Sequence, residues 1–375
     1  MTASAAKGLE GVVASKTSLS FIDGLEGILV YRGYNIHELA PHASFLESVF
    51  LLWHVRLPNH QELERFEDDL AAERTIHAKT LEGLLQCVSE NTIPMAALRT
   101  GISLEGMFDA DAEDNSPDAN ERKAKRLVAR TPTIIAAIHR IRQGLEPLVP
   151  DPSLSFSQDF VRMATGEAGS DEAVAALDRT LLLYLDHGFN ASTFACRVIA
   201  ATLGDMHSAV AGGVGALKGS LHGGANAKAM DTLLEIGEPD NVTPWLERAF
   251  AEKRKIMGFG HRVYRTEDPR ATHLREMSRV LTEQAGLEKF YKMSRELEEQ
   301  MISKKGINPN VDFYCATVYY ALGIPIDLYT PLFAMGRMGG WTGHVMEQHA
   351  NNRLIRPRAE YVGEQDLRWV AIKDR

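Results

Sequence analysis

The sequence predicts an all-α fold, mainly helical and divided into two domains, with a short β-hairpin near the N-terminus. Apolar residues recur at helical spacing along most of the chain and alternate with a period of two only near its start. With 375 residues, of which 45% are hydrophobic and 24% charged, the chain can bury a sizeable core and fill about two domains. These observations together indicate an ordinary globular helical protein.

The hairpin is expected in residues 11–34. Apolar stretches at Val12-Val13, 19–22 and 28–31 alternate there with the turn residues Asp23-Gly24. This segment is short, so it does not change the predicted fold class.

The clearest helix is expected to begin at the N-cap candidates Ser170 and Asp171 and to end near Gly188. Its apolar residues follow the i, i+4, i+7, i+8 spacing of an amphipathic helix: Leu177, Leu181, Tyr184 and Leu185. The same spacing predicts further helices at 62–73, 133–143, 227–236, 244–255, 269–284 and 296–304.

Two stretches are expected to be solvated loops between helices. Residues 109–125 combine acidic residues, Asn and Pro with basic residues and have no apolar period, and residues 144–153 are rich in proline. Neither stretch marks a definite domain boundary.

The run from Phe194 to Gly219 is nearly uncharged and carries small residues at helical spacing. Small residues allow helices to approach each other closely. The run therefore indicates either an internal helix pair or a subunit interface made of tightly packed helices.

Charge and composition exclude several classes of protein. A net charge of -9 gives no support for binding nucleic acid or an acidic membrane face. No stretch reaches 18 apolar residues, and Met1 to Lys16 lacks a signal or transit pattern, so we expect a cytoplasmic protein without a membrane segment. The three cysteines, Cys87, Cys196 and Cys315, are expected to be buried free thiols.

The histidines do not follow a metal-binding pattern. None of the 13 histidines pairs with another at i, i+4, and His344 and His349 are five apart, about 140° around a helix. We expect no metal, and the alternative is a site assembled from scattered histidines. The sequence contains no Gly-x-Ser-x-Gly hydrolase motif, and the glycine-rich segment 211–219 lacks the ending of a phosphate loop.

Two histidines and one aspartate indicate an acid/base site. His222 lies in Leu221-His222-Gly223-Gly224, His261 follows Gly258-Phe259-Gly260, and Asp312 lies in the segment 308–314. Glycine beside an imidazole allows close approach of a substrate and frees backbone N–H groups to stabilise an oxyanion. A carboxylate would complete a set that abstracts a proton.

Three arginines point to an acidic substrate. Arg270 follows His261 by nine residues, Arg337 is flanked by glycines in 335–340, and Arg356 precedes a proline near the C-terminus. A guanidinium group binds carboxylates through two parallel hydrogen bonds. A substrate with carboxylate groups is therefore expected.

Five motifs, in order and spacing, closely resemble the citrate synthase family: 186–193, 221–226, 258–264, 268–270 and 309–314. The resemblance runs from about Gly8 to Gly363. It implies a homodimeric helical enzyme whose large domain, residues 1–222 and 318–375, carries the interface. A small domain, residues 223–317, would close over the substrates. The run at 194–219 would then belong to the interface, with His222 at the hinge.

The resemblance also implies condensation of oxaloacetate with acetyl-coenzyme A, followed by thioester hydrolysis, without a metal or a resident cofactor. Asp312 would remove the methyl proton, His222 would donate to the enolate oxygen, and His261 would polarise the ketone. His222 is expected to be neutral because it lies before a predicted helix N-terminus. The implied oxaloacetate ligands are His187, His261, Arg270, Arg337 and Arg356, the last from the partner subunit. The implied coenzyme A contacts are Gly258, Phe259, Gly260, Arg265, Lys304 and Lys305.

The sequence departs from the family pattern at Ile93, where many relatives have histidine before Pro-Met, and a local packing change is expected. It also lacks the N-terminal extension of the NADH-inhibited hexameric relatives, so regulation by NADH is not expected. The motifs leave open 2-methylcitrate synthase, which uses propionyl-coenzyme A, because one methylene changes transition-state binding by only about 1 to 3 kcal/mol. A catalytically silent coenzyme A-binding relative is the alternative from another class.

Overall fold

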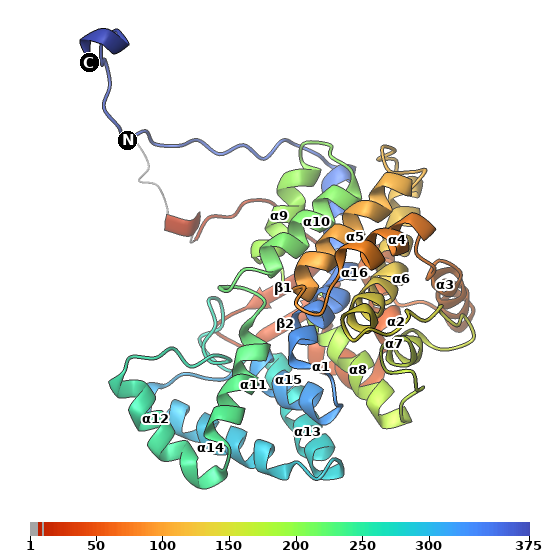
Figure 1. The fold of residues 1–375 in the computed structure, drawn as a ribbon, viewed down its shortest axis with the longest axis vertical. Helices are drawn as coiled ribbons and strands as arrows, with labels where there is room; N and C mark the ends of the chain where they lie inside the picture. Colours follow the sequence, from red (N-terminus) through yellow and green to blue (C-terminus); the bar gives the residue numbers. More distant parts are fainter. Residues whose placement is uncertain (1–6, 10) are drawn as a thin grey trace.

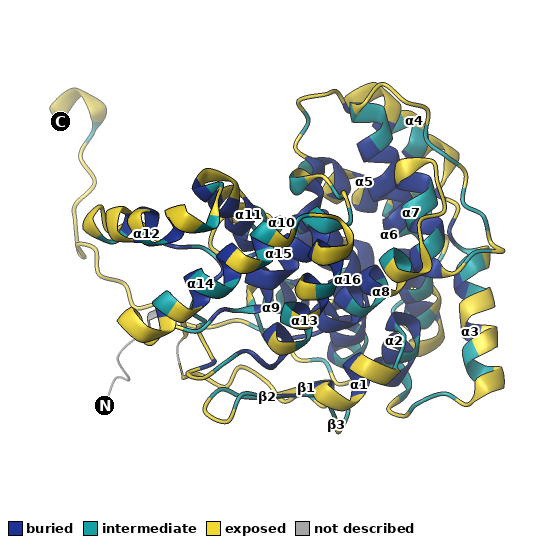
Figure 2. Ribbon diagram, turned by 90° about the horizontal axis from the view of Figure 1, so that it is seen from below, coloured by how far each residue is buried: buried dark blue, intermediate teal, exposed yellow. Residues whose placement is uncertain are grey.

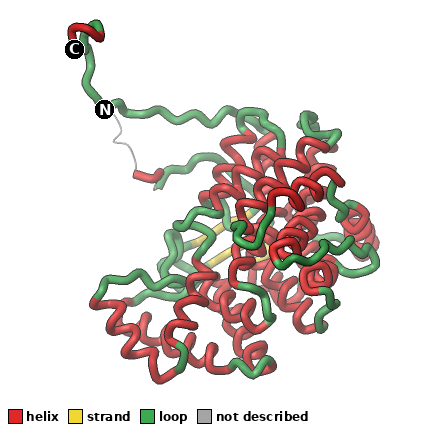
Figure 3. The backbone as a smooth tube through the Cα atoms, in the orientation of Figure 1, coloured by secondary structure: helices red, strands yellow, loops and turns green. Residues whose placement is uncertain are grey.

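The computed structural model describes residues 7–9 and 11–375, and in this part of the chain it confirms the predicted mainly helical fold (Figures 1 and 3). The strands are β1 Ser20–Asp23, β2 Ile28–Tyr31 and β3 Tyr34–Asn35. The α-helices are α1 Ile36–His42, α2 Phe45–His54, α3 His60–Ala72, α4 Ala78–Cys87, α5 Pro94–Phe108, α6 Pro117–Arg142, α7 Phe156–Thr165, α8 Asp171–Tyr184, α9 Ala191–Ala200, α10 Met206–Leu217, α11 Ala225–Ile236, α12 Val242–Ala251, α13 Pro269–Gln284, α14 Glu288–Lys305, α15 Val311–Ala321 and α16 Tyr329–Ala350. Short 3-10 helices occur at Lys7–Leu9, Pro239–Asn241, Ile326–Leu328 and Ile372–Asp374.

The N-terminal hairpin forms as predicted, although it begins later. β1 pairs antiparallel with β2, with Ser20 opposite Tyr31, and β2 continues the sheet to β3. Val12 and Val13 are exposed and lie outside any strand, so the expectation of a strand there is wrong. The sheet has the order β1-β2-β3, and these two valines pair with none of its strands.

The starts of α8 and α13 follow the capping signals in the sequence. The predicted end of α8 near Gly188 is wrong, because the helix ends at Tyr184, where the N–H of Leu185 donates to the carbonyl oxygen of Leu182 instead of continuing the α-helical pattern. α8 begins after Ser170, whose side chain accepts a hydrogen bond from the N–H of Ala173. α13 begins at Pro269 and ends at Gln284, as predicted, because Asp268 caps its N-terminus and a proline is favoured at the first helical position.

The prediction of a loop over 109–125 is wrong from residue 117 onward. α6 begins at Pro117 behind the N-cap Ser116, and its first turns are polar. Lys123 is nevertheless fully buried, and its ammonium group donates to the carbonyl oxygens of Ala112, at 3.2 Å, and Asp114. The start of this helix was not predicted because its first turns lack an apolar period, although they bury a lysine. The second predicted loop, 144–153, contains no helix or strand.

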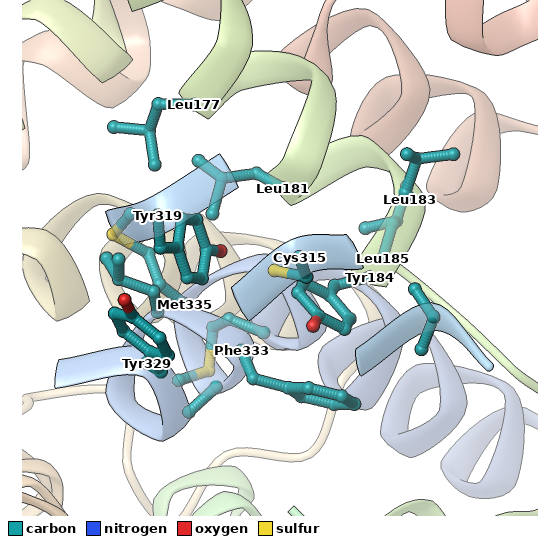
Figure 4. Close-up of a cluster of buried hydrophobic side chains, with 14 of the residues drawn as sticks. Leu177, Leu181, Leu183, Tyr184, Leu185, Cys315, Tyr319, Tyr329, Phe333 and Met335 are labelled. Atoms are coloured by element: carbon teal, nitrogen blue, oxygen red, sulfur yellow. The ribbon is translucent and has the colours of Figure 1, made fainter. Parts of the chain in front are cut away.

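The core centres on α16, which is buried over most of its length (Figure 2). α16 packs against α6, α8, α9 and α10, and Trp341 at its middle is fully buried. Figure 4 shows how the side chains of α8, α15 and α16 interdigitate beside the candidate site. Cys196 and Cys315 are buried, as expected, but Cys87 is exposed, so the expectation of a buried thiol is wrong for this last residue of α4.

Helices α11, α12 and α14 gather at one end of the molecule (Figures 1 and 2). All three lie within residues 223–317, and the expected boundary at 317–318 falls inside α15. The division into domains stays a prediction. Over the described residues, no helix has the length and apolar character needed to cross a membrane.

Candidate active site

A two-residue antiparallel ladder brings the segments of His261 and Asp312 together. Phe259 bridges to Pro309, the N–H of Gly260 donates to Asn308 at 2.9 Å, and the N–H of Asn310 donates to Gly258 at 2.9 Å. Gly258 has φ 84°, and a Cβ there would lie 3.1 Å from the Cα of Phe313. Glycine is needed at this position because both its conformation and its contact with α15 exclude a side chain.

His261 is held as a neutral hydrogen-bond donor. Its Nδ1 accepts from the backbone N–H groups of Val263, at 3.0 Å, and Tyr264, at 3.1 Å. Backbone N–H groups can only donate, so the ring proton lies on Nε2. Burial, followed by the charge of Arg270, lowers the pKa of His261 to about 4. At neutral pH the ring therefore presents one N–H donor and no charge.

His222 has the opposite tautomer. Its Nε2 accepts from the backbone N–H of Ser192 at 3.3 Å and lies 2.9 Å from the hydroxyl of the same serine. The ring proton is therefore on Nδ1. Burial and then the charge of Arg337 lower the pKa of His222 to about 4. A pKa this low makes the ring neutral at neutral pH, as predicted. The predicted cause was the N-terminus of the next helix, but burial has the largest effect on the pKa, and α11 begins only at Ala225.

Asp312 lies in the first turn of α15. Asn310 caps this helix and accepts from the N–H of Asp312 at 3.0 Å, while the Tyr184 hydroxyl donates to Oδ1 of Asp312 at 3.2 Å. Burial raises the pKa of Asp312 to about 7, against the lowering effects of Arg270 and of the Tyr184 hydroxyl. A carboxyl group with a pKa near neutral suits a general base.

Arg270 is oriented by a buried carboxylate. Its Nε and Nη2 donate to the two oxygens of Asp268 at 2.9 and 2.7 Å. Asp268 also accepts from the N–H of Val311 at 3.2 Å, which ties the first turn of α13 to that of α15. Nη1 of Arg270 forms no hydrogen bond with any residue that the structure describes, so this edge can receive a ligand.

Arg337 reaches the site because glycines let α16 approach the end of α8. A Cβ at Gly336 would lie 2.8 Å from the carbonyl oxygen of Leu181, and one at Gly340 would lie 2.2 Å from that of Leu185. Nε of Arg337 donates to the carbonyl oxygen of Tyr184 at 2.6 Å. Nη1 is buried and has no partner among the described residues. Burial lowers the pKa of this arginine to about 10, so it is charged at neutral pH and suited to an anion.

His187 completes the cluster. Its ring centroid lies 5.1 Å from that of His261, and its Nε2 lies 3.1 Å from the Tyr264 hydroxyl. Burial, with the nearby arginines, holds the pKa of His187 well below its usual range.

Electrostatic coupling shows that the predicted residues converge. The charge of Arg270 lowers the pKa values of His187, His261 and Asp312. The charge of Arg337 lowers the pKa values of His187, His222 and Asp312. Six of the residues predicted from sequence thus share one site: His187, His222, His261, Arg270, Asp312 and Arg337.

Arg356 is not brought to this site within its own chain. It is exposed, and it belongs to the segment after α16 that leaves the body of the molecule (Figure 1). Its predicted role toward a partner subunit stays a prediction.

The expected coenzyme A contacts are of two kinds. Gly258, Phe259 and Gly260 belong to the ladder that supports the site. The basic side chains Arg265, Lys304 and Lys305 are exposed, and Nζ of Lys304 donates to Gln300 at 2.8 Å. Lys304 and Lys305 end α14, from which the chain leads directly to the ladder residue Asn308. Their role toward a ligand stays a prediction.

The structure adds supporting residues to which the sequence analysis gave no role in the site: Asp268, which orients Arg270; Ser192, which sets the tautomer of His222; and Tyr184 and Tyr264, which contact Asp312 and His187. Only Asp268 had a local signal, because Asp before Pro is typical of a helix N-terminus. Within the described part of the chain, no group of three or more His, Cys, Asp and Glu residues could hold a metal ion.

Comparisons with known proteins place this chain among enzymes that transfer an acyl group in a condensation reaction. The family described as "Citrate synthase, C-terminal domain" matches residues 8–358. The chain is 49% identical to "Citrate synthase 2" of Bacillus subtilis over 371 residues, 99% of each chain. It is 44% identical over 360 residues to a 2-methylcitrate synthase of Mycobacterium tuberculosis, 96% of this chain and 91% of that one.

Among solved structures, the chain is similar to a citrate synthase from the archaeon Thermoplasma acidophilum in a ternary complex with carboxymethyl coenzyme A and oxaloacetate. The TM-score is 0.93, with 33% identity and 98% of each chain covered. The chain belongs to the citrate synthase family.

Proposed function

We propose that this chain condenses acetyl-coenzyme A with oxaloacetate and hydrolyses the resulting thioester to citrate and free coenzyme A. One observation carries the proposal: two neutral imidazoles, each with its donor nitrogen set by a backbone N–H, lie in one site with a buried carboxyl group whose pKa is about 7. This set can abstract a weakly acidic proton while it stabilises two developing oxyanions.

The first step is removal of a proton from the methyl group of the thioester. Asp312 takes this proton, and the charge that develops on the thioester oxygen accepts a hydrogen bond from Nδ1–H of His222. Because His222 is neutral, it donates this hydrogen bond without being deprotonated. The electron pair of the broken C–H bond forms the carbon–carbon double bond of an enolate, whose terminal carbon is the nucleophile.

The second step forms the carbon–carbon bond. The enolate carbon attacks the ketone of oxaloacetate, whose oxygen becomes an alkoxide that accepts a hydrogen bond from Nε2–H of His261. Arg270 and Arg337 bind the two carboxylates of oxaloacetate, and His187 supports the same substrate. Water then attacks the thioester carbonyl and expels the coenzyme A thiol.

A homodimer belongs to this proposal. A groove of about 460 Å³ between α5 and α10 supports it, because partly buried small residues of the predicted interface run line one of its sides. Its lining residues are Arg99, Thr100, Ser103, Leu104, Ala211, Gly212 and Gly215. In such a dimer, Arg356 extends into the partner's site and contacts oxaloacetate.

The remaining parts of the proposal concern closure, cofactors and location. The segment 223–317 closes over the substrates after oxaloacetate binds, and Gly258 to Gly260 with Arg265, Lys304 and Lys305 hold coenzyme A. The reaction uses no metal and no resident cofactor, since the base and both donors are side chains. A cytoplasmic location is also part of this proposal.

The second candidate is 2-methylcitrate synthase activity. It is favoured by the 44% identity to a relative of that name. The same base and donors serve propionyl-coenzyme A, and one extra methylene in an apolar pocket changes transition-state binding by only about 1 to 3 kcal/mol. A catalytically silent relative is disfavoured, because a binding protein needs no base aligned with two imidazole donors.

The deciding experiment measures free thiol release from acetyl-coenzyme A and from propionyl-coenzyme A, each with and without oxaloacetate. Oxaloacetate-dependent release with a preference for acetyl supports the proposal. A preference for propionyl supports the second candidate. Release with neither thioester overturns the mechanism.

A further inference from the structure

Tyr184 contacts both an arginine and the catalytic base. It is the last residue of α8, where the final carbonyl groups of a helix have no partner within the helix. Its carbonyl oxygen accepts from Nε of Arg337 at 2.6 Å, and its hydroxyl donates to Oδ1 of Asp312 at 3.2 Å. The carbonyl oxygen and the hydroxyl of Tyr184 therefore contact Arg337 and Asp312, which both have a role in the proposed function.

The position of the Tyr184 ring is fixed by packing. The ring is fully buried and lies 4.1 Å, centroid to centroid, from the ring of Phe333 on α16. On the α15 side its neighbour is Cys315, one turn after Asp312 (Figure 4). Because a fully packed ring has little freedom, the hydroxyl is directed at the carboxyl group rather than at solvent.

Several other groups act on Asp312, among them Cys315 and Tyr319 of its own helix α15. Arg270 and Asp268 face it from the start of α13, Arg337 faces it from α16, and burial is the largest influence. The proposed function places substrate carboxylates on both arginines, which reduces their attraction for the Asp312 carboxylate. The hydrogen bond from the Tyr184 hydroxyl to Asp312 is then unaffected by substrate binding.

We propose that Tyr184 is a positioning residue for the catalytic base: its hydroxyl holds Oδ1 of Asp312, and so leaves Oδ2 to take the proton from the acyl methyl group. This inference rests on the proposed function and goes beyond it, because it assigns separate roles to the two carboxyl oxygens. Tyr184 acts through Asp312 and need not touch the substrate.

The inference has a consequence for pH dependence. A hydrogen bond donated to a carboxylate favours the ionised form and lowers its pKa, as the Tyr184 hydroxyl does here. Without the hydroxyl, the pKa of Asp312 rises, and the base is protonated and inactive up to a higher pH. The contact of the Tyr184 carbonyl with Arg337 does not depend on the hydroxyl.

The test is Tyr184→Phe, which keeps the ring and the carbonyl. We expect the acid limb of kcat/KM for acetyl-coenzyme A, at saturating oxaloacetate, to move up by about one pH unit, so that the rate below the midpoint falls about tenfold. The KM for oxaloacetate stays within about twofold of the wild-type value, since Arg337 keeps its carbonyl contact. The matched control is Tyr329→Phe, which removes a buried hydroxyl that has no partner among the described residues and leaves the profile unchanged.

A second variant covers the case in which Tyr184→Phe does not fold. Placing 3-fluorotyrosine at position 184 makes the phenol a stronger donor without changing its shape, so the acid limb should move to lower pH. An unchanged acid limb in a folded Tyr184→Phe protein, or an unshifted or upward-shifted limb with fluorotyrosine, overturns the inference. A wild-type protein that releases no thiol overturns the proposed function instead, so that measurement comes first.

Discussion

At the scale of single residues, backbone N–H groups, which can only donate, decide which nitrogen of each catalytic imidazole carries the proton. The backbone N–H groups of Val263 and Tyr264 bind Nδ1 of His261, and that of Ser192 binds Nε2 of His222. The two rings therefore offer different nitrogens to the substrate. The remaining requirement is a base, and the burial of Asp312 brings its pKa to about 7.

Asp312→Asn tests the base directly. The amide keeps the size of the side chain, so the protein should fold and bind oxaloacetate, while turnover falls by about 10²- to 10⁴-fold because no group accepts the methyl proton. Thiol release and calorimetric titration with oxaloacetate measure the two effects. Asp240→Asn, at an exposed position, is the control. Near-normal turnover in Asp312→Asn would show that another group is the base.

Arg270→Lys tests the carboxylate clamp. Lysine cannot form the two hydrogen bonds by which Arg270 pairs with Asp268, so its charge is no longer held in a fixed position. We expect the KM for oxaloacetate to rise about tenfold or more, and the KM for acetyl-coenzyme A to change little. Steady-state kinetics with each substrate varied in turn measure both. Arg279→Lys, on the exposed part of the same helix, should change neither. Equal losses for both substrates would contradict the assignment.

At the scale of elements, glycines decide how closely α16 and α8 pack. Gly340→Ala places a methyl group 2.2 Å from the carbonyl oxygen of Leu185, so one helix must move. Alanine favours a helix over glycine by about 1 kcal/mol, but we expect a net loss of about 1 to 3 kcal/mol in the free energy of unfolding. Chemical denaturation measures this loss.

Gly83→Ala in α4 is the matched control for that substitution. Its nearest neighbour is the end of the flexible Leu104 side chain at 3.1 Å, so the helical preference of alanine should dominate. The protein should then be as stable as the wild type or slightly more stable. Equal destabilisation by both substitutions would mean that close helix approach is not the reason for glycine at 340.

The elements that the sequence predicted best are those with local signals. α13 was predicted from its first residue to its last, because Asp268 and Pro269 mark its start. The start of α6 was missed because its first turns lack an apolar period and bury Lys123 against loop carbonyls.

The same contrast holds in the candidate site. The histidines, Asp312 and the arginines were found through nearby glycines and family motifs. Ser192 and Tyr184 were not, because Ser192 meets its partner 30 residues away and Tyr184 meets Asp312 128 residues away. Local patterns in a single sequence carry no information about such pairs.

At the scale of the whole molecule, the proposed dimer predicts complementation between defective subunits. Arg356→Ala and His222→Ala should each abolish or strongly reduce activity alone. In a mixed dimer, one site has the intact His222 of its own subunit and Arg356 of the other, so it should work. Random exchange of equal amounts should restore about one quarter of the wild-type activity. If Arg356 served its own subunit's site, mixing would restore none.

Arg337 has a consequence for the stability of the whole chain. Its Nε donates to one carbonyl oxygen, but its Nη1 is buried and forms no hydrogen bond with the described residues. This buried charge lowers the stability of the folded protein. An anion that relieves this cost binds the folded state alone, and oxaloacetate at about one hundred times its Kd would add about 2.7 kcal/mol to the free energy of unfolding. The supply of substrate would then set how long the chain resists heat and proteases, and metabolic scarcity would shorten the lifetime of the protein itself.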